Sequence, residues 1–228
     1  MVGDIHGAHK ALLQCFERSQ FDPDKDLLIS LGDVCDGWPE VHKVMDELLR
    51  IRNLKFIFSN HDQWTLKWFN TGWKGHEWVS QGGSATLESY QGDRKYVPDA
   101  HRQLLQNAPF FLELDNKLFV HGGIDPDLDI TEQESDLLLW DRELLYQAVR
   151  AHKKNSDHRY GKWSDIFVGH TTTQVYKTLE PIHACNVWAV DTGSGWDGKL
   201  TMMDIDNHEY WQSDATPTLY PNSAGRQH

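Results

Sequence analysis

The sequence has no long hydrophobic run: none of its apolar stretches approaches the roughly 20 residues that a membrane-spanning helix requires. Its start does not resemble a signal peptide either, because the chain opens directly on a glycine-rich motif at residues 3–7. At 228 residues it fits a single domain, since one hydrophobic core can grow to about 250 residues. We therefore expect one domain and no membrane segment.

Cysteine is also scarce, with three residues that are odd in number and far apart: Cys15, Cys35 and Cys185. Their number and spacing exclude a disulfide framework, and they do not have the close spacing of a zinc cluster. Free thiols suit a reducing compartment, so we expect a cytoplasmic protein.

Positive charge is in deficit: 22 Lys and Arg face 34 Asp and Glu, which gives a formal net charge of −12. Binding to an extended nucleic acid depends on many Lys and Arg contacts with phosphates, so this charge argues against such a partner. It does not exclude a single phosphate group, because bound metal ions would make a site locally cationic.

Short apolar runs that end in polar residues predict buried strands at residues 27–31 and 56–58. Helical periodicity at about residues 9–18 and 41–49 lies before and between them. This order is typical of parallel strands joined by helical crossovers. Sheets of this kind bind ligands at the carboxyl ends of their strands.

The second half of the sequence has a different pattern. Residues 110–120 predict a β-hairpin, and apolar runs at 166–168, 187–190 and 200–211 predict further strands. Helical periodicity at about residues 132–149 lies between these two sets. The predicted fold is therefore α/β, a sandwich of two mixed β-sheets flanked by helices.

Side chains of the kind that bind metals stand just after the apolar runs: Asp4, His6, Asp33, Asn60, His121 and His170. Asp4 and His6 are two residues apart, so on an extended segment they point the same way and can share one ion. Asp33 is suited to bridging, because a carboxylate has two oxygens that can bind two cations about 3.5–4 Å apart. The set predicts a site for two metal ions.

His61 is a better candidate for a general acid than for a metal ligand. Its neighbour Asn60 already points to the metals, and successive side chains diverge. A carboxylate beside the ring would orient it and favour its protonated form, and either Asp36 or Asp62 can supply that carboxylate.

Five motifs occur in a familiar order: residues 3–7 (Gly-Asp-Ile-His-Gly), 32–36 (Gly-Asp-Val-Cys-Asp), 60–62 (Asn-His-Asp), 121–123 (His-Gly-Gly) and 169–171 (Gly-His-Thr). On these motifs the chain resembles the PPP-type, calcineurin-like metallophosphoesterases. The likeness is greatest to the bacterial and phage serine/threonine protein phosphatases and the related bis(5′-nucleosyl)-tetraphosphatases. It extends from residue 3 to about residue 203 and implies the metallophosphoesterase form of the two-sheet sandwich.

The resemblance implies one ion on Asp4, His6 and Asp33, and a second ion on Asp33, Asn60, His121 and His170. It also implies direct attack on phosphorus by a metal-bound hydroxide, without a phosphoenzyme. His61, paired with Asp36, would protonate the leaving group. Asn60, His61 and Arg142 would contact the substrate phosphate. The ligand types suit manganese, iron and zinc alike, and we expect Mn²⁺.

Three features depart from the family pattern. Gly37 and Trp38 stand where the family has Arg-Gly, so one phosphate-binding guanidinium is missing. Ser59 replaces a glycine, a change expected to alter only the turn. Met1 and Val2 are too few to form the usual central first strand, which indicates missing N-terminal residues or a misassigned start.

Residues 63–92 are rich in tryptophan and glycine. Two interpretations are open: a helical excursion that packs its aromatic side chains into the core, or a partial lid that meets the substrate's leaving group. The polar residues 212–228 predict a loosely ordered tail, which leaves residues 1–211 as the catalytic domain.

The leading functional hypothesis is a two-metal phosphomonoesterase that acts on phosphoserine or phosphothreonine in a phosphorylated protein, or on a small phosphate ester. Hydrolysis of dinucleoside polyphosphates is the nearest alternative, because the tryptophans can stack on a nucleobase. A nucleic-acid phosphatase or phosphodiesterase is disfavoured by the net charge. A metal-free scaffold is disfavoured by the intact set of six ligand-type residues.

Overall fold

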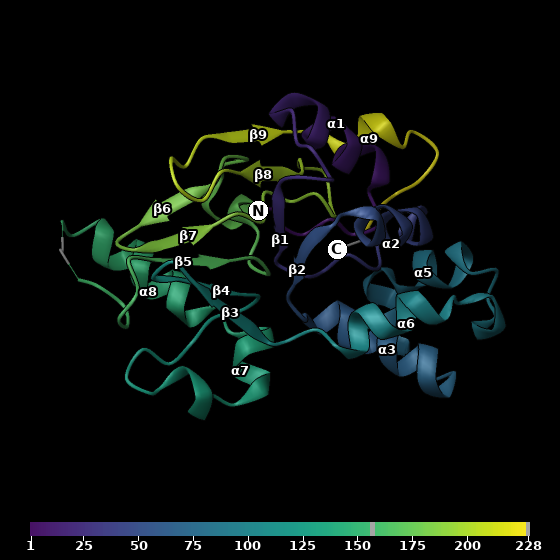
Figure 1. Ribbon diagram of the computed structural model, residues 1–228, viewed down its shortest axis with the longest axis horizontal. Helices are drawn as coiled ribbons and strands as arrows, with labels where there is room; N and C mark the ends of the chain where they lie inside the picture. Colours follow the sequence, from purple (N-terminus) through teal and green to yellow (C-terminus); the bar gives the residue numbers. More distant parts are fainter. Residues whose placement is uncertain (156–157, 227–228) are drawn as a thin grey trace.

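Residues 1–155 and 158–226, which the computed structural model describes, form two mixed β-sheets with helices on their outer faces (Figure 1). Side chains from both sheets meet in a shared core that includes Ile29, Phe119, Phe167 and Met203. The rings of Phe119 and Phe167 stack with their centroids 5.0 Å apart. The expected α/β sandwich of two mixed sheets is therefore confirmed.

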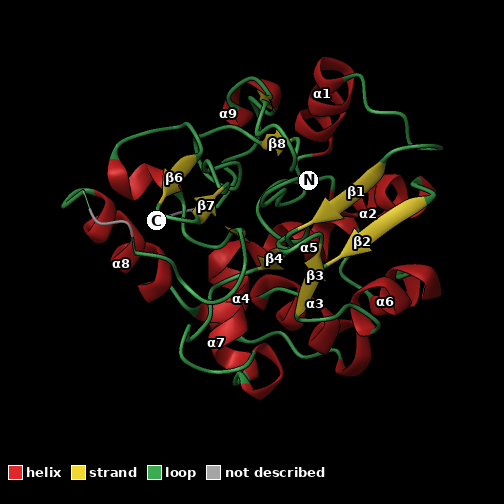
Figure 2. Ribbon diagram, turned by 60° about the vertical axis from the view of Figure 1, so that its left-hand side comes forward, coloured by secondary structure: helices red, strands yellow, loops and turns green. Residues whose placement is uncertain are grey.

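The first sheet is built around Val2. β1 (Leu27–Ser30) pairs in parallel with β2 (Asn53–Phe56), and the two strands run side by side in the same direction in Figure 2. Val2 pairs in parallel with Ser30 and antiparallel with Met202, so it joins β1 to β8 (Thr201–Met203). β8 then pairs antiparallel with β9 (Tyr210–Gln212). Val2 thus occupies the central position expected of the first strand.

The second sheet has the strand order β3-β4-β5-β7-β6. β3 (Phe111–Leu114) and β4 (Lys117–Val120) form the hairpin that the sequence predicts. β4, β5 (Asp165–Val168) and β7 (Val187–Ala189) are parallel to one another, and β6 (Ile182–Ala184) is antiparallel to β7. The sequence did not predict β6, because it is only three residues long and lies at the sheet's edge.

Amphipathic helices cover the outer faces of both sheets. The apolar side chains of α1 (His9–Ser19) and α2 (Val41–Arg50) belong to the same core cluster as Leu28 and Phe56 of the first sheet. On the second sheet, α7 (Ser135–Trp140) and α8 (Glu143–His152) share a core with Val120 and Ile166. The two groups of helices lie on opposite sides of the sheets in Figure 1. None of the helices in residues 1–155 and 158–226 has the length and apolarity to cross a membrane.

The remaining elements are α3 (Asn60–Thr71), α4 (His76–Trp78), the π-helical turn η1 (Val79–Gly83), α5 (Ser84–Ser89), α6 (Asp99–Gln106), the short 3₁₀ turns η2 (Arg94–Tyr96), η3 (Ile130–Glu132) and η4 (Thr173–Tyr176), and α9 (Thr216–Leu219). The helical region predicted at 132–149 is interrupted at Asp141. The Asp141 carboxylate accepts hydrogen bonds from the backbone N–H groups of Glu143 and Leu144, so it caps a new helix there.

The tryptophan-rich residues 63–92 form α3, α4, η1 and α5. Trp68 and Trp78 are buried in the core, as the first interpretation of this segment expects. Trp64 is only partly buried and lies with its ring 5.1 Å from that of His61. The lid interpretation therefore stays a prediction for the surroundings of Trp64.

The expectation of a loosely ordered tail from residue 212 is wrong for the part that the structure describes. Gln212 belongs to β9, and α9 follows shortly after it. Tyr220 is buried, stacks on Trp38 with centroids 5.1 Å apart, and donates a hydrogen bond to Glu40 over 2.7 Å. The prediction rested on the polar composition of the tail, which does not reveal that a few aromatic and hydrogen-bonding side chains hold it in place. Residues 227–228, also in the predicted tail, lie outside the described residues.

Candidate metal centre

The six ligand-type residues follow the carboxyl ends of neighbouring strands. Asp4 and His6 follow Val2, Asp33 follows β1, Asn60 follows β2, His121 follows β4 and His170 follows β5. Because Val2, β1 and β2 are parallel to one another, as are β4 and β5, the sandwich delivers all six residues to one edge.

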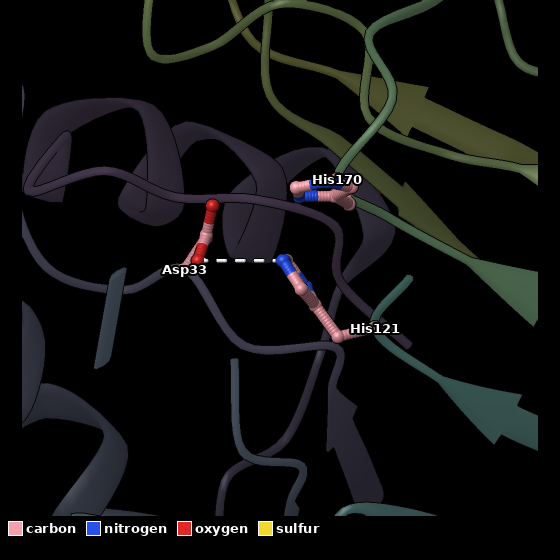
Figure 3. Close-up of side chains that lie close together, drawn as sticks. All are labelled: Asp33, His121 and His170. Atoms are coloured by element: carbon pink, nitrogen blue, oxygen red, sulfur yellow. Dashed lines mark ion pairs between the residues drawn. The ribbon is translucent and has the colours of Figure 1, made fainter. Parts of the chain in front are cut away.

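Two groups of side chains within the described residues could hold a metal ion. One contains Asp4, His6 and Asp33, and the other contains Asp33, His121 and His170. In each group the ligand atoms lie within 4.8 Å of one another, and all five residues are buried. Figure 3 shows the second group, in which Asp33, His121 and His170 converge from separate segments. Asp33 is common to both groups.

Asp33 uses a different oxygen toward each group. Its Oδ2 lies 3.4 Å from His6 Nε2, and its Oδ1 lies 3.4 Å from His121 Nε2. The two carboxylate oxygens therefore face the two groups separately, which is the arrangement that a bridging ligand needs.

The protonation of both histidines follows from their other ring nitrogen. His6 Nδ1 lies 3.0 Å from the backbone oxygen of Cys35, and His121 Nδ1 lies 2.8 Å from that of Leu31. A carbonyl can only accept, so Nδ1 carries the proton in each ring and Nε2 keeps a lone pair. His121 Nε2 also lies 2.8 Å from Asn60 Oδ1, which brings two acceptor atoms together. A cation between such atoms would relieve their repulsion.

Two further polar atoms in the centre are buried and have no hydrogen-bond partner among the described residues. Asp4 Oδ1 and His170 Nε2 make no hydrogen bond to any residue in the described ranges. Such atoms carry a desolvation cost unless something binds them. The donor set of carboxylate, amide and imidazole groups fits divalent transition-metal ions. These residues thus satisfy the requirements of a dinuclear centre.

Burial dominates the electrostatics of the centre. It holds the pKa of His6 and His170 well below the ordinary value and also lowers that of His121, so the three rings are neutral at pH 7. Burial, together with the nearby Asp191 and Asp33, raises the pKa of Asp4 well above its usual range. Neutral imidazoles and a carboxyl that resists ionisation without a cation are typical of a metal site.

The backbone is bent at four of the site residues. His6, Asp33, Asp36 and His170 have φ angles of 50°, 46°, 70° and 60°. Left-handed backbone is uncommon for residues other than glycine and clusters at functional sites. It turns each side chain sharply at the end of its strand. Asp4 also needs a neighbour without a side chain, because a Cβ on Gly169 would lie 2.3 Å from Asp4 Oδ1.

His61 forms a buried pair with Asp36. Its Nδ1 lies 2.7 Å from Asp36 Oδ2, and the carboxylate also accepts hydrogen bonds from Trp78 Nε1 and Thr86 Oγ1. Burial raises the pKa of Asp36 to about 7, against the opposing effect of these two donors. Burial lowers the pKa of His61 to about 3. The sequence left Asp36 and Asp62 as candidates for the carboxylate beside His61, and in the structure it is Asp36 that contacts the imidazole ring.

Asp62 has a different set of contacts. Its carboxylate accepts from Ser59 Oγ over 2.7 Å and from the Cys35 N–H over 3.3 Å. Ser59 Oγ in turn accepts from the backbone N–H of Asp33 over 2.8 Å and caps α3. The expectation that Ser59 alters only the turn is therefore wrong. Its hydroxyl connects the segment of Asp33 to the start of α3, which a glycine at this position could not do.

Arg142 lies next to the second group. Its Nη1 donates to the backbone oxygen of His170 over 3.1 Å and to Thr171 Oγ1 over 3.2 Å. The residue is exposed, so the remaining donors of the guanidinium are accessible. Trp140, also exposed, packs against the rings of both Trp64 and His170.

Two further ionisable groups reach the centre, and neither was predicted as a site residue from the sequence. Asp191 follows β7, and burial raises its pKa to about 6. Asp191 comes directly after the apolar run at residues 187–190, but only the fold places it beside Asp4. Arg226 comes from the tail, and its Nη1 lies 3.3 Å from His6 Nε2. No motif or periodicity in the sequence marks Arg226.

Comparisons with known proteins agree with this arrangement. The model of the calcineurin-like phosphoesterase family matches residues 1–193. The serine/threonine-protein phosphatase 2 of Escherichia coli (strain K12) is 28% identical over 210 residues, covering 90% of this chain and 91% of that protein. The symmetrical bis(5′-nucleosyl)-tetraphosphatase of Pseudomonas fluorescens (strain SBW25) is 26% identical over 268 residues, covering 91% of each chain.

Solved structures show a similar fold. A crystal structure of a metallophosphoesterase from Sphaerobacter thermophilus superposes with a TM-score of 0.56 at 14% identity, covering 96% of this chain and 92% of that one. The family match, the order of the motifs and the convergence of their side chains at one edge lead to one conclusion. The chain belongs to the calcineurin-like phosphoesterase family, whose members are dinuclear-metal-dependent hydrolases of phosphoesters.

Proposed function

We propose that this protein is a phosphomonoesterase of the serine/threonine protein phosphatase type. The observation that carries the proposal is the position of Asp33, whose two oxygens face two separate groups of ligand atoms. The relatedness to proteins named serine/threonine-protein phosphatases supports this substrate class.

Two divalent ions, with Mn²⁺ the expected one and Fe or Zn as alternatives, would be held as the motifs suggest. Asp4, His6 and Asp33 would hold one, and Asp33, Asn60, His121 and His170 the other. When bound, the ions would polarise the phosphate and lower the pKa of water to supply a nucleophile near neutral pH.

The chain's own groups would bind the phosphate and deliver the proton. Arg142 would direct its free guanidinium donors at the phosphate oxygens, beside Asn60 and His61. Asp36 holds His61 by Nδ1, which leaves Nε2 for the leaving group's oxygen. An approaching phosphate dianion would raise the depressed pKa of His61 and so favour the acid form. No side chain needs to form a covalent bond with the phosphoryl group.

The substrate class can be tested on one preparation of manganese-loaded protein. We expect it to release phosphate from a phosphothreonine peptide faster than it cleaves a dinucleoside tetraphosphate or a 3′-phosphorylated oligonucleotide. Activity on none of the monoesters would contradict the proposal. Metal analysis of the same sample shows whether an inactive protein has bound metal or is a metal-free scaffold.

Replacing Arg142 with alanine is expected to raise KM for p-nitrophenyl phosphate roughly tenfold, because charge-assisted hydrogen bonds to the phosphate are lost. The turnover number should change less than KM. Arg150→Ala is the matched control, since Arg150 is an exposed arginine on the last turn of α8, the helix that begins directly after Arg142. A KM equal to that of the control would remove Arg142 from the phosphate site.

Manganese affinity is expected to rise with pH, by about tenfold per unit where one proton is displaced. Asp4 is the ligand expected to release this proton wherever the pH lies below its raised pKa, since burial disfavours its ionised form and a cation favours it. The ligand histidines supply none near pH 7, because their pKa values are already lowered. Calorimetric titrations at pH 6, 7 and 8, in two buffers of different ionisation enthalpy, measure both affinity and proton release. An affinity independent of pH would contradict this assignment.

Hydrolysis of dinucleoside polyphosphates is the second candidate, and one observation favours it. The rings of Trp64 and Trp140 lie 5.1 Å apart, with His61 beside one and His170 beside the other. An exposed tryptophan at this edge could stack on a nucleobase. If so, Trp140→Ala would impair cleavage of diadenosine tetraphosphate while leaving hydrolysis of p-nitrophenyl phosphate unchanged.

Further assignments complete the proposal. Residues 1–211 would form the catalytic domain. The tail would pack against this domain, as the contacts of Tyr220 with Trp38 and Glu40 support. Cys15 and Cys35 are buried free thiols, which supports a cytoplasmic location. The substrate would be a phosphorylated protein or a small phosphate ester, and the surplus of acidic residues disfavours extended nucleic acid.

A further inference from the structure

Arg226 brings a positive charge from the C-terminal tail into the candidate metal centre. Its backbone N–H donates to the Gly195 oxygen over 2.9 Å, and its guanidinium lies over the Trp196 ring, 4.4 Å from the centroid. Nη1 then reaches to within 3.3 Å of His6 Nε2. The residue is therefore held at three points, one through its backbone and two through its guanidinium, and the last of these lies in the candidate metal centre.

The path of this side chain is lined by three glycines from three different segments. A Cβ on Gly37 or Gly82 would lie 3.3 or 3.0 Å from Arg226 Cγ, and one on Gly195 would lie 3.1 Å from Cδ. A larger residue at any of these positions would press on the arginine stem. Gly37 also has a φ of +86°, a conformation that favours glycine. The stem of Arg226 thus fills the space beside position 37.

The tail that carries Arg226 is itself anchored. Tyr220 stacks on Trp38 and accepts a hydrogen bond from the Lys10 N–H over 2.8 Å. Gly225 packs so closely on the same indole that a Cβ there would lie 2.7 Å from the Trp38 ring. Trp38 in turn donates through Nε1 to the Ser194 oxygen over 2.6 Å. These contacts fix the direction in which the chain arrives at residue 226.

The guanidinium has more donors than partners. Its Nε is buried and makes no hydrogen bond within the described residues. Its contact with His6 uses the lone pair on Nε2, because Nδ1 of that ring is committed to Cys35. The same lone pair would hold a metal ion, so in a loaded centre the guanidinium needs another acceptor. A phosphate dianion offers several oxygens in the geometry that arginine prefers.

We propose that Arg226 is a substrate-binding residue that donates hydrogen bonds to the phosphate of the substrate. It would supply, from the tail, the guanidinium that Gly37 cannot supply. Arg142 contacts the His170 segment and Arg226 contacts His6, so the two arginines flank the centre from its two groups of ligands. This inference rests on the proposed phosphoesterase function, but phosphate binding can be measured without turnover.

An inhibitory tail is the competing explanation, because Arg226 occupies a lone pair that a metal ligand needs. The two explanations predict opposite results. Removal of an inhibitory arginine would tighten phosphate binding or raise activity, whereas removal of a substrate-binding arginine would weaken both.

The test is calorimetric titration of inorganic phosphate into manganese-loaded protein, together with its inhibition of p-nitrophenyl phosphate hydrolysis. We expect Arg226→Ala to raise the Kd and the inhibition constant for phosphate roughly tenfold, the loss expected for one or two charge-assisted hydrogen bonds. Manganese content should stay unchanged. Arg226→Lys keeps the positive charge but lacks the planar guanidinium. Its Kd for phosphate should lie between those of the wild type and Arg226→Ala. Arg50→Ala is the control, as Arg50 is an exposed arginine paired with Glu47 on α2.

Guanidinium ion, added far below denaturing concentrations, should restore part of the phosphate affinity that Arg226→Ala has lost. It should leave the phosphate affinity of the Arg50→Ala control unchanged. Equal phosphate affinity in the wild type and Arg226→Ala would overturn the inference, as would tighter binding or faster turnover in the variant. Absence of phosphate binding by the wild type would also overturn it. A wild type that binds phosphate through Arg226 but hydrolyses no ester would instead refute the proposed function alone.

Discussion

Asp33→Ala is expected to abolish the dinuclear centre, reducing bound manganese from two ions per chain to one or none. Asp33 belongs to both groups of ligand atoms, and its two oxygens face His6 and His121 from 3.4 Å each. The loss of both ions' stabilisation should slow turnover by roughly three orders of magnitude or more, since several kcal/mol are at stake and each 1.36 kcal/mol is tenfold. Metal analysis after gel filtration measures the first effect, and phosphate release the second.

Asp33→Asn refines this experiment. The amide keeps the shape and one oxygen ligand but cannot offer a negatively charged oxygen to each ion. We expect it to retain more metal than Asp33→Ala and to turn over slowly. The reverse case is informative as well: two ions per chain in Asp33→Ala would show that Asp33 is not the bridge.

His61→Asn is expected to slow turnover by about 10²–10⁴-fold, the range typical of losing a general acid. Manganese content should remain intact, because His61 belongs to neither group of candidate ligands. The effect should depend on the leaving group. The threonine side chain of a phosphothreonine peptide would leave as a basic alkoxide and needs the proton, whereas p-nitrophenolate leaves readily without it. The decrease in turnover should therefore be much larger for the peptide.

A second buried histidine serves as the control for His61. His101 pairs with Asp46 over 2.9 Å and with Tyr90 over 2.8 Å, and it belongs to neither group of candidate metal ligands. His101→Asn should lower stability without the dependence on leaving group. If His61→Asn slowed both substrates equally, or not at all, His61 would have no role as the acid.

The sequence was informative about the centre because its residues follow strand ends. Asp33 and His121 come directly after short apolar runs, and parallel strands bring their carboxyl ends to one edge. The same regularity predicted the hairpin of β3 and β4 and the sandwich class. Local periodicity and local polarity were sufficient for these features.

The features that sequence patterns missed depend on contacts between distant segments. Ser59 shares its hydroxyl between Asp33 and Asp62, which the residue type alone does not indicate. Arg226 reaches the centre through a glycine-lined path built from three segments. A polar tail is weak evidence for packing, because one stacked aromatic such as Tyr220 is enough to fix its course.

The most direct test of a two-ion phosphomonoesterase is a titration of metal-stripped protein with Mn²⁺, in which phosphate release from a phosphothreonine peptide is measured at each step. If Asp33 joins two ions in one centre, activity should rise with upward curvature and reach its maximum at two equivalents per chain. Saturation at one equivalent, or no phosphate release at any ratio, would contradict the account.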